Sequence, residues 1–285
     1  MEKNAERLQV IENIKVALEN KNFNAKVEIH DHTVTEEERQ KVILKYDNRK
    51  RKFKNKAKTM IARQIADGIT EYINYKTEII GIENIKKIKT GAIITSNHFS
   101  KVDNTIIRYL LHRMGRGRKF YVIVQESNIF MQGTLGWLLK NNRTIPINMD
   151  RKYISTNFEP SLEKILKKKQ FILIYPEEEM WFNYKLPRPG KIGAYHYACK
   201  FNVPIIPCFI EMQNTNKIDN DGFYTQKYKL HVMNPIYPDT TLDFKEQKET
   251  LRKQDYELKK AKYEEVYGKK LDYTFDETTD IAGWI

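Results

Sequence analysis

Short apolar segments alternate with amphipathic ones from about residue 77 onward. Several apolar segments are nearly continuous, as expected for strands that are covered on both faces. The expected strands are 77–81, 91–96, 119–125, 143–148, 170–176, 203–212 and 227–237. Helices are expected at 104–114, 129–141, 157–169 and 190–201, followed by a charged amphipathic helix at about 244–267. This order predicts an α/β domain with a central, mostly parallel sheet flanked by helices.

The pattern divides the chain at about residue 75. We expect 1–74 to form an N-terminal, helical and basic segment that could contact a membrane, and 75–285 to form the α/β domain with its C-terminal helix. One helical face of the first segment is apolar, because its members recur every three or four residues. They are Ala57, Met60, Ile61, Ile65, Ile69, Tyr72 and Ile73.

This apolar face has two interpretations. Exposing so many isoleucines to water is costly, so we expect the face to pack on the core of the domain. Alternatively, the helix lies on anionic lipid, where each basic residue near the surface contributes ~1 kcal/mol.

Charge adds an attraction to polyanions. The 285 residues include 50 Lys and Arg against 37 Asp and Glu, a formal net charge of +13. The excess is concentrated between Lys41 and Arg63, where ten basic residues face one acid, a local net of 10 − 1 = +9. Nucleic acid, an anionic membrane surface and phosphorylated substrates are all compatible with this charge.

No run of ~18 apolar residues occurs, so no segment is expected to span a bilayer. The first ten residues also lack the apolar core of a signal peptide. We therefore expect the protein in the cytoplasm or peripherally on the cytoplasmic face of a membrane. Cys199 and Cys208 lack metal-ligand spacing and are expected to be buried apolar residues.

Three of the expected strands end in polar clusters. Ligands of α/β sheets bind outside the carboxyl ends of the strands, so these clusters mark the expected site. They are Asn97, His98 and Asp103 after the second strand, Asp150 and Arg151 after the fourth, and Glu177 to Glu179 after the fifth.

His98 and Asp103 have the spacing of a general base and the carboxylate that orients it. The Asp can fold back to accept a hydrogen bond from one imidazole nitrogen, which leaves the other nitrogen free to take a proton from a hydroxyl. No serine nearby is suited to act as the nucleophile, so the hydroxyl would belong to the substrate. Taken alone, this spacing is more often structural than catalytic.

The neighbouring motifs resemble those of the glycerolipid acyltransferase family, which includes the 1-acylglycerol-3-phosphate acyltransferases. That family has NHxxxxD after a strand, then an Arg after a second strand, then (Phe/Tyr)-Pro-Glu-Gly, then Val-Pro-Ile-Ile-Pro. Here the segments "NHFSKVD", "IPINMDR", "YPEE" and "VPIIP" follow in the same order. The resemblance covers roughly residues 75–240.

The resemblance implies a role for each matching residue. His98 would be the general base, oriented by Asp103, and Arg151 would bind the phosphate of the acceptor. Glu177 matches the glutamate that binds the acceptor, and Asn97 beside the base is also expected to contact substrate. The segment 204–207 would shape the site. The donor would be acyl-CoA or acyl carrier protein and the acceptor a lysolipid at an anionic membrane surface, without cofactor, metal or covalent enzyme intermediate.

The chain departs from the family after the motif glutamate. Gly, Thr and Arg are usual there, whereas this chain has Glu178, Glu179 and Met180. Losing the glycine removes a place where backbone can approach a ligand closely. Two added carboxylates would repel a phosphate dianion, so we expect Arg188, with Lys191, to supply phosphate contacts from the next loop.

Two other functions remain open from the sequence. One is a hydrolase or a catalytically idle lipid-binding relative, which the altered residues 178–180 favour. The other is nucleic-acid binding by the basic segment 41–63. We do not expect nucleic acid as a partner, because aromatic residues are not interleaved through that segment.

Overall fold

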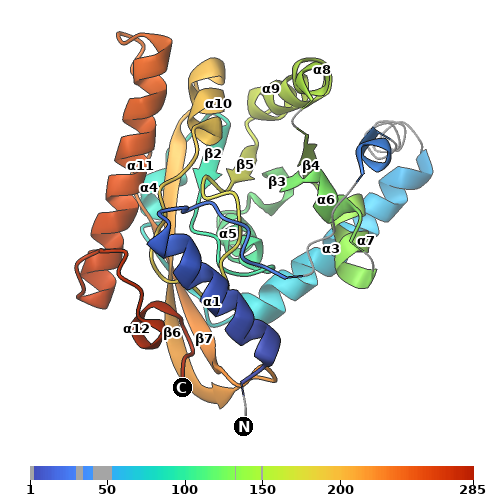
Figure 1. Ribbon diagram of the computed structural model, residues 1–285. Helices are drawn as coiled ribbons and strands as arrows, with labels where there is room; N and C mark the ends of the chain where they lie inside the picture. Colours follow the sequence, from blue (N-terminus) through green and yellow to red (C-terminus); the bar gives the residue numbers. More distant parts are fainter. Residues whose placement is uncertain (1–2, 30–34, 41–52, 132, 149) are drawn as a thin grey trace.

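A seven-stranded sheet forms the centre of the molecule (Figure 1). The computed structural model describes residues 3–29, 35–40, 53–131, 133–148 and 150–285. The strands are β1 (Glu78–Ile80), β2 (Ala92–Thr95), β3 (Phe120–Gln125), β4 (Thr144–Ile147), β5 (Phe171–Ile174), β6 (Ile205–Ile218) and β7 (Tyr224–Val232). Each expected strand is found, with β6 longer than its apolar segment.

The strand order is β1-β7-β6-β2-β5-β3-β4. β6, β2, β5, β3 and β4 run parallel to one another, whereas β7 is antiparallel to β6 and β1 runs parallel to β7. The prediction of a mostly parallel sheet is therefore confirmed. β2 lies in the middle of the sheet, and its carboxyl end opens at the same edge as those of β3, β4, β5 and β6.

Helices cover both faces of the sheet (Figure 1). The α-helices are α1 (Ala5–Glu19), α3 (Phe53–Asn74), α4 (Glu83–Lys86), α5 (Asn104–Arg113), α6 (Glu126–Ile129), α7 (Gly133–Asn141), α8 (Arg151–Tyr153), α9 (Glu159–Lys167), α10 (Gly193–Phe201), α11 (Phe244–Tyr267) and α12 (Glu277–Asp280). A 3-10 turn (Gly117–Lys119) and a π-helical turn (Ile154–Phe158) complete the regular structure.

The two faces of β2 show why its sequence is apolar throughout. Ile94 packs in a cluster with α5, including Leu110, while Ile93 packs in a cluster with α9 and α10, including Ala198. Both isoleucines are fully buried. Successive side chains of a strand point to opposite faces, so a strand covered on both sides needs apolar residues at every position.

α11 is tied to the end of β2 by a buried polar cluster. Asp255 of α11 accepts hydrogen bonds from the hydroxyls of Thr95 at 2.8 Å and Tyr195 at 2.6 Å. Lys259 donates a third hydrogen bond at 2.9 Å. These side chains are buried, and they hold α10 and α11 against the strand that leads to His98.

The apolar face of α3 points to solvent, so the expectation that it packs on the core is wrong. Met60, Ile61, Ile65 and Tyr72 are 51%, 47%, 42% and 81% exposed. Ala57 is exposed as well, whereas Ile69 and Ile73 are half-buried. Residues 41–52, which carry much of the basic run, lie outside the described residues.

α3 docks on α5 through polar side chains instead. Asp67 pairs with Arg108 at 3.3 Å and with His112 at 3.1 Å, and Glu71 contacts His112 at 2.9 Å. Asn74 donates to the hydroxyl of Thr105 at 2.9 Å. A polar seam therefore joins the two helices, formed by residues 67, 70 and 74 of α3 with residues 105, 108 and 112 of α5 and flanked by the exposed Glu71. Because α3 packs on α5 through this seam, the apolar face of α3 stays exposed to solvent.

The segment around α1 packs on the main body in a third apolar cluster. Ile14 and Val27 are buried there with Trp181, Phe223 and Ile281. The predicted division into 1–74 and 75–285 stays a prediction. Among the described residues, no helix combines the length and the apolar character needed to cross a bilayer.

Candidate active site

His98 lies in the loop that joins β2 to α5, and the structure places it against Asp103 as the spacing predicts. Nδ1 of His98 is 2.7 Å from Oδ2 of Asp103. A carboxylate can only accept, so Nδ1 carries the proton and Nε2 of the neutral ring keeps a free lone pair. The His98 side chain is 20% exposed, whereas that of Asp103 is 1% exposed.

Asp103 is held by further hydrogen bonds. Its Oδ2 also accepts from the backbone N–H groups of Phe99 at 3.0 Å and Ser100 at 3.2 Å. Its Oδ1 accepts from the hydroxyl of Tyr175 at 2.5 Å. These donors fix the carboxylate in position and satisfy it in a buried site.

Tyr175 is a site residue that the sequence reasoning missed. Its ring stacks on the imidazole of His98, with the centroids 3.9 Å apart and the planes 14° from parallel. Burial, together with the charge of Asp103, raises the pKa of the Tyr175 phenol well above its usual range, so the hydroxyl stays a donor. A signal was present in the sequence, because Tyr175 directly follows the strand that pairs with β2.

The loop after β5 braces the backbone of His98 on both sides. The N–H of His98 donates to Oε2 of Glu177 at 3.2 Å, and its carbonyl accepts from the N–H of Trp181 at 3.1 Å. Asn183 donates its N–H to the carbonyl of Phe99 at 3.1 Å. Glu177 thus contacts His98 through the backbone N–H of that residue.

Glu177 and Arg188 form a buried ion pair, with Nη2 of Arg188 2.9 Å from Oε2 of Glu177. The Arg188 guanidinium also donates to the carbonyls of Phe23, at 2.8 Å, and Glu179, and it lies over the ring of Trp181. Burial lowers the pKa of Arg188, and the Glu177 carboxylate opposes that shift. Arg188 was expected to contact the phosphate of the substrate. In the structure its guanidinium is buried and forms an ion pair with the Glu177 carboxylate.

Two distant segments hold this loop in place. Asn24 donates to the carbonyl of Glu177 at 3.0 Å, and the indole N–H of Trp181 donates to the carbonyl of Ala25 at 3.0 Å. From the other end of the chain, Ala282 and Asn183 exchange hydrogen bonds at 2.8 and 3.0 Å. No pattern in the sequence indicates either contact, because the acceptor in each of these hydrogen bonds is a backbone carbonyl.

Asn97, the residue before His98, makes structural hydrogen bonds to β6. Its Nδ2 donates to the carbonyl of Ile210 at 3.1 Å, and its Oδ1 accepts from the N–H of the same residue at 2.9 Å. Only 1% of Asn97 is exposed. It was expected to contact substrate, but the structure places its amide between β2 and β6, where it positions the start of the His98 loop.

Arg151 and Lys191 keep exposed side chains. Arg151 begins α8, just after β4, which lies three strands from β2. Neighbouring strands are about 4.8 Å apart, so Arg151 is displaced along the sheet edge by about 14 Å from the end of β2. The structure therefore does not bring Arg151 into contact with His98, whereas the loop of Lys191 hydrogen-bonds to Pro176 beside Glu177.

Glu178 occupies the position where the resembling family has glycine. Its φ angle is +62°, in the left-handed region that glycine adopts without strain. Glu179 accepts a 2.9 Å hydrogen bond from Gln125 at the end of β3. The predicted segment 204–207 enters β6 directly beside β2, where Pro204 accepts from the N–H of Ile93 at 3.0 Å.

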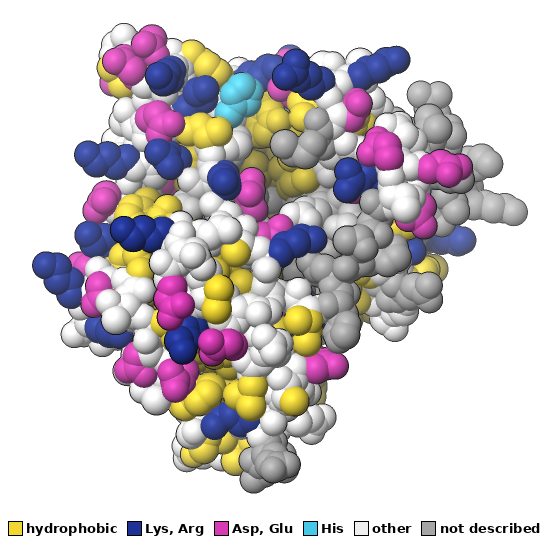
Figure 2. All heavy atoms as spheres, in the orientation of Figure 1, with side chains coloured by type: hydrophobic (Ala, Val, Ile, Leu, Met, Phe, Trp, Pro, Cys, Tyr) yellow, Lys and Arg dark blue, Asp and Glu magenta, His cyan; other side chains and the backbone are white. Residues whose placement is uncertain are grey.

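On the face drawn in Figure 2, Lys and Arg side chains are interspersed with Asp and Glu. The same face is hollowed between α10 and the α8–α9 region, and the floor of the hollow is apolar. The described part of this face thus combines a mixed-charge rim with an apolar recess.

Comparison with known proteins gives the family context. Residues 76–211 match the Acyltransferase family. Two curated relatives are chloroplastic 1-acyl-sn-glycerol-3-phosphate acyltransferases, one from Brassica napus and one from Arabidopsis thaliana. Each is 30% identical over 181 residues, which is 63% of this chain and 48% or 46% of the relative. The chain thus spans about half the length of the curated relatives it matches.

A solved structure shares the fold. The crystal structure of a 1-acyl-sn-glycerophosphate acyltransferase from Thermotoga maritima aligns with a TM-score of 0.52 at 16% sequence identity. The alignment covers 93% of this chain and 98% of that chain. At this identity the likeness concerns the arrangement of strands and helices.

Proposed function

We propose that this chain, whose residues 76–211 match the Acyltransferase family, moves a fatty acyl group from a thioester to a lysophospholipid hydroxyl. The donor would be acyl-CoA or acyl carrier protein, and the acceptor a lipid such as 1-acylglycerol-3-phosphate. The names of the curated relatives support this acceptor.

The observation that carries the proposal is the contact between His98 and Asp103. Nδ1 donates to a buried carboxylate at 2.7 Å, so Nε2 is the nitrogen that can accept a proton. His98 is partly exposed, so a hydroxyl from outside can reach it. This is the base and orienter of a catalytic triad, with the nucleophile supplied by the substrate.

In the proposed reaction, Nε2 of His98 takes the proton of the acceptor hydroxyl as its oxygen attacks the thioester carbonyl. The resulting imidazolium is stabilised by the negative charge of Asp103. When the tetrahedral intermediate collapses, the C–S bond breaks and His98 returns the proton to the departing sulfur. The products are an ester and a free thiol, and His98 is regenerated.

The exposed face of α3 supports an anionic bilayer as the working surface. Met60, Ile61, Ile65 and Tyr72 are exposed on one side of a helix that begins in a basic run. An apolar face beside basic residues is typical of helices that lie in the headgroup region. Peripheral association with the cytoplasmic face would bring the active site to its lipid acceptor.

The test is thiol release from palmitoyl-CoA and from palmitoyl acyl carrier protein in the presence of anionic vesicles. Wild type, His98→Ala and His98→Gln are compared, with lysophosphatidate and other lysolipids as acceptors. Circular dichroism and urea unfolding show whether the variants keep the fold.

We expect release by wild type only when an acceptor is present, and loss of at least about 10³-fold in both variants. Undiminished turnover in a folded His98 variant would refute the role of the base. Release by wild type without acceptor would identify a thioesterase, the alternative that Glu178 and Glu179 favour.

A further inference from the structure

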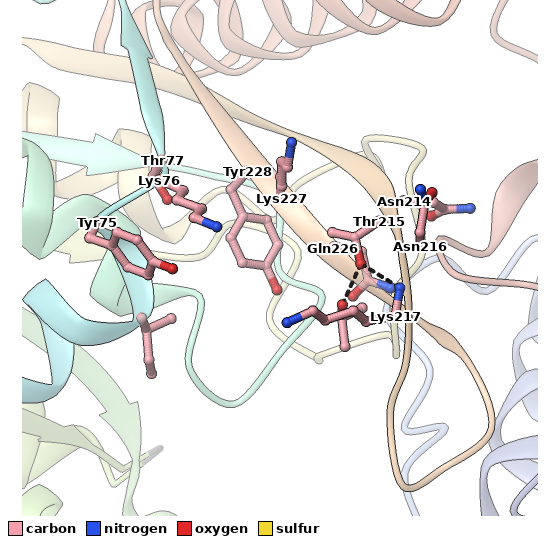
Figure 3. Close-up of a pocket in the computed structure, with 12 residues that line it drawn as sticks. Tyr75, Lys76, Thr77, Asn214, Thr215, Asn216, Lys217, Gln226, Lys227 and Tyr228 are labelled. Atoms are coloured by element: carbon pink, nitrogen blue, oxygen red, sulfur yellow. Dashed lines mark hydrogen bonds between the residues drawn. The ribbon is translucent and has the colours of Figure 1, made fainter.

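A polar pocket of about 450 Å³ opens between the end of α3 and the β6–β7 hairpin (Figure 3). Its lining includes Tyr75, Lys76, Thr215, Lys217 and Tyr228. Three of its twelve lining residues are lysines and none is acidic. The pocket therefore carries the charge of an anion site.

Two of the lysines are directed into this pocket. Figure 3 shows Lys76 and Lys217 reaching from opposite walls toward Tyr228, with the hydroxyl of Tyr75 also pointing inward, whereas Lys227 points away. The structure pairs neither Lys76 nor Lys217 with a carboxylate among the described residues. Lys76 lies over the ring of Tyr75, 5.2 Å from its centroid. Two ammonium groups and two phenols thus converge on one space.

The pocket adjoins the active site through Tyr228. The ring of Tyr228 lies 5.7 Å from that of Phe99, the residue after His98. Burial, with a contribution from the charge of Asp103, raises the pKa of Tyr228 to about 12, so its hydroxyl remains a donor at neutral pH. One wall of the pocket is therefore packed against the catalytic loop.

The pocket also extends well beyond the catalytic loop. Asn97 is bonded to Ile210, and Lys217 lies seven residues further along the same strand. A strand rises about 3.3 Å per residue, so the backbone of Lys217 lies roughly 23 Å along β6 from Ile210, and the pocket extends from there to Tyr228, toward which the Lys217 side chain reaches. A ligand held here and reacting at His98 must be long.

We propose that this pocket binds the phosphorylated nucleotide of a coenzyme A thioester, with Lys76 and Lys217 on its phosphate oxygens and Tyr75 against the adenine. This inference rests on the acyl transfer proposed above. Lysine ammonium groups bind phosphate through charge-assisted hydrogen bonds, and an exposed tyrosine ring offers a stacking surface.

The length of the two substrates separates donor from acceptor. The phosphate of a lysophosphatidate is only a few bonds from the hydroxyl that reacts, so its site must adjoin His98. The phosphates of a coenzyme A thioester lie at the far end of the pantetheine arm from the reacting carbonyl. A cationic pocket that begins beside Phe99 and extends away from it fits the donor.

The test is calorimetric binding of adenosine 3′,5′-bisphosphate to wild type, Lys76→Gln, Lys217→Gln and the double variant. Lys227→Gln is the matched control, because it removes the same charge from a side chain that points away. We expect each of the two single variants to raise Kd about tenfold, the double variant to raise it further, and the control to change it less than twofold. The KM for palmitoyl-CoA should rise in parallel at unchanged kcat.

Three results would overturn the assignment. One is wild-type affinity for the bisphosphate in the double variant. Another is a double variant that loses binding to anionic vesicles and keeps the bisphosphate, which would make the pocket a lipid-headgroup site. The third is wild type that turns over palmitoyl acyl carrier protein and binds no bisphosphate.

The His98→Ala variant separates this inference from the proposed function. It should bind the bisphosphate with wild-type Kd. If wild type binds the bisphosphate through these lysines but transfers no acyl group, the nucleotide site is supported and the proposed acyl transfer is refuted.

Discussion

The ring of Tyr175 stacks on the imidazole of His98 at 3.9 Å while its hydroxyl donates to Asp103, the residue that orients the same imidazole. One side chain therefore fixes both the plane of the His98 ring and the position of the Asp103 carboxylate.

Tyr175→Phe should keep the stacking and remove the donor to Asp103. A hydrogen bond to a charged group contributes about 1.5–3 kcal/mol, so we expect kcat to fall by about 10- to 100-fold with little change in KM. Steady-state kinetics with saturating palmitoyl-CoA measure this. Tyr184→Phe is the control, because the buried Tyr184 hydroxyl has no hydrogen-bond partner among the described residues and its loss should leave kcat within twofold. Equal effects of the two variants would contradict the role of Tyr175.

Glu178→Gly should stabilise the protein. Glu178 is held at a φ of +62°, and a left-handed conformation costs a residue with a Cβ about 1–2 kcal/mol. Glycine also increases the conformational entropy of the unfolded chain, which offsets part of this gain. We therefore expect the free energy of unfolding, measured with urea, to rise by roughly 0.5–1 kcal/mol. Glu179→Gly, at a position without positive φ, should be destabilising, and a matching gain there would remove the conformational explanation.

Glu177→Gln should destabilise the site strongly. It leaves the Arg188 charge buried without its carboxylate, which typically costs about 3–5 kcal/mol. Combining it with Arg188→Met should recover part of this loss, because the unpaired charge is removed as well. Urea unfolding of the two single variants and the double variant gives the coupling free energy between Glu177 and Arg188. If the two losses in unfolding free energy simply add, the two residues do not interact directly.

The seam between α3 and α5 should weaken above neutral pH. The hydrogen bond to Asp67 raises the pKa of His112 above its ordinary 6.5. Burial is the largest single influence on the pKa of Asp67 and works to raise it, but the hydrogen bonds and positive charges of His112 and Arg108 together outweigh burial, so the net shift is downward from 3.8.

A raised His pKa stabilises the fold below about pH 6.5, and this contribution is lost as pH rises through the folded value. The lowered Asp67 pKa adds stability above about pH 4, which is lost only as pH falls further. The difference in unfolding free energy between wild type and His112→Gln should therefore be larger at about pH 6 than at about pH 8.5. A difference that grows with pH would show that His112 is not the protonated partner.

The outer face of α3 should be required for vesicle binding. Ile65→Glu places a charge in the exposed apolar face and should reduce co-sedimentation with anionic vesicles about tenfold without loss of stability. Gln254→Glu adds the same charge on α11, at the opposite side of the molecule in Figure 1, and should have a much smaller effect. Equal losses would mean that net charge, and not this face, governs binding.

Much of the fold could be predicted because its signals are local. The helix expected at about 244–267 matches α11, which begins with a capping box at Asp243 and ends at Gly268 in a left-handed conformation. The strands were recognisable because burial on both faces requires continuous apolar sequence. The helix expected at 129–141 is instead divided, since α6 ends at Ile129 and Gly133 has a φ of +74°.

The orientation of α3 could not be read from its apolar pattern. The pattern identifies the apolar face correctly, but which face is buried depends on the partner, and α5 presents Arg108 and His112 to it. The same limit applies to Arg188. Its sequence position suggested a phosphate ligand, whereas the burial of Glu177 beside it determined its role.

The loop that braces His98 is held by Asn24 and Ala25 on one side and by Ala282 on the other, through contacts that join residues 99 to 156 positions apart. Contacts between residues so far apart in the chain form late, because both residues must have left the ribosome before the contact can form. The His98 loop is therefore braced from both sides only after residues 280–282 have been synthesised. A nascent chain whose residues 280–282 are still inside the ribosome would hold a His98 loop that is braced from the Asn24 and Ala25 side only.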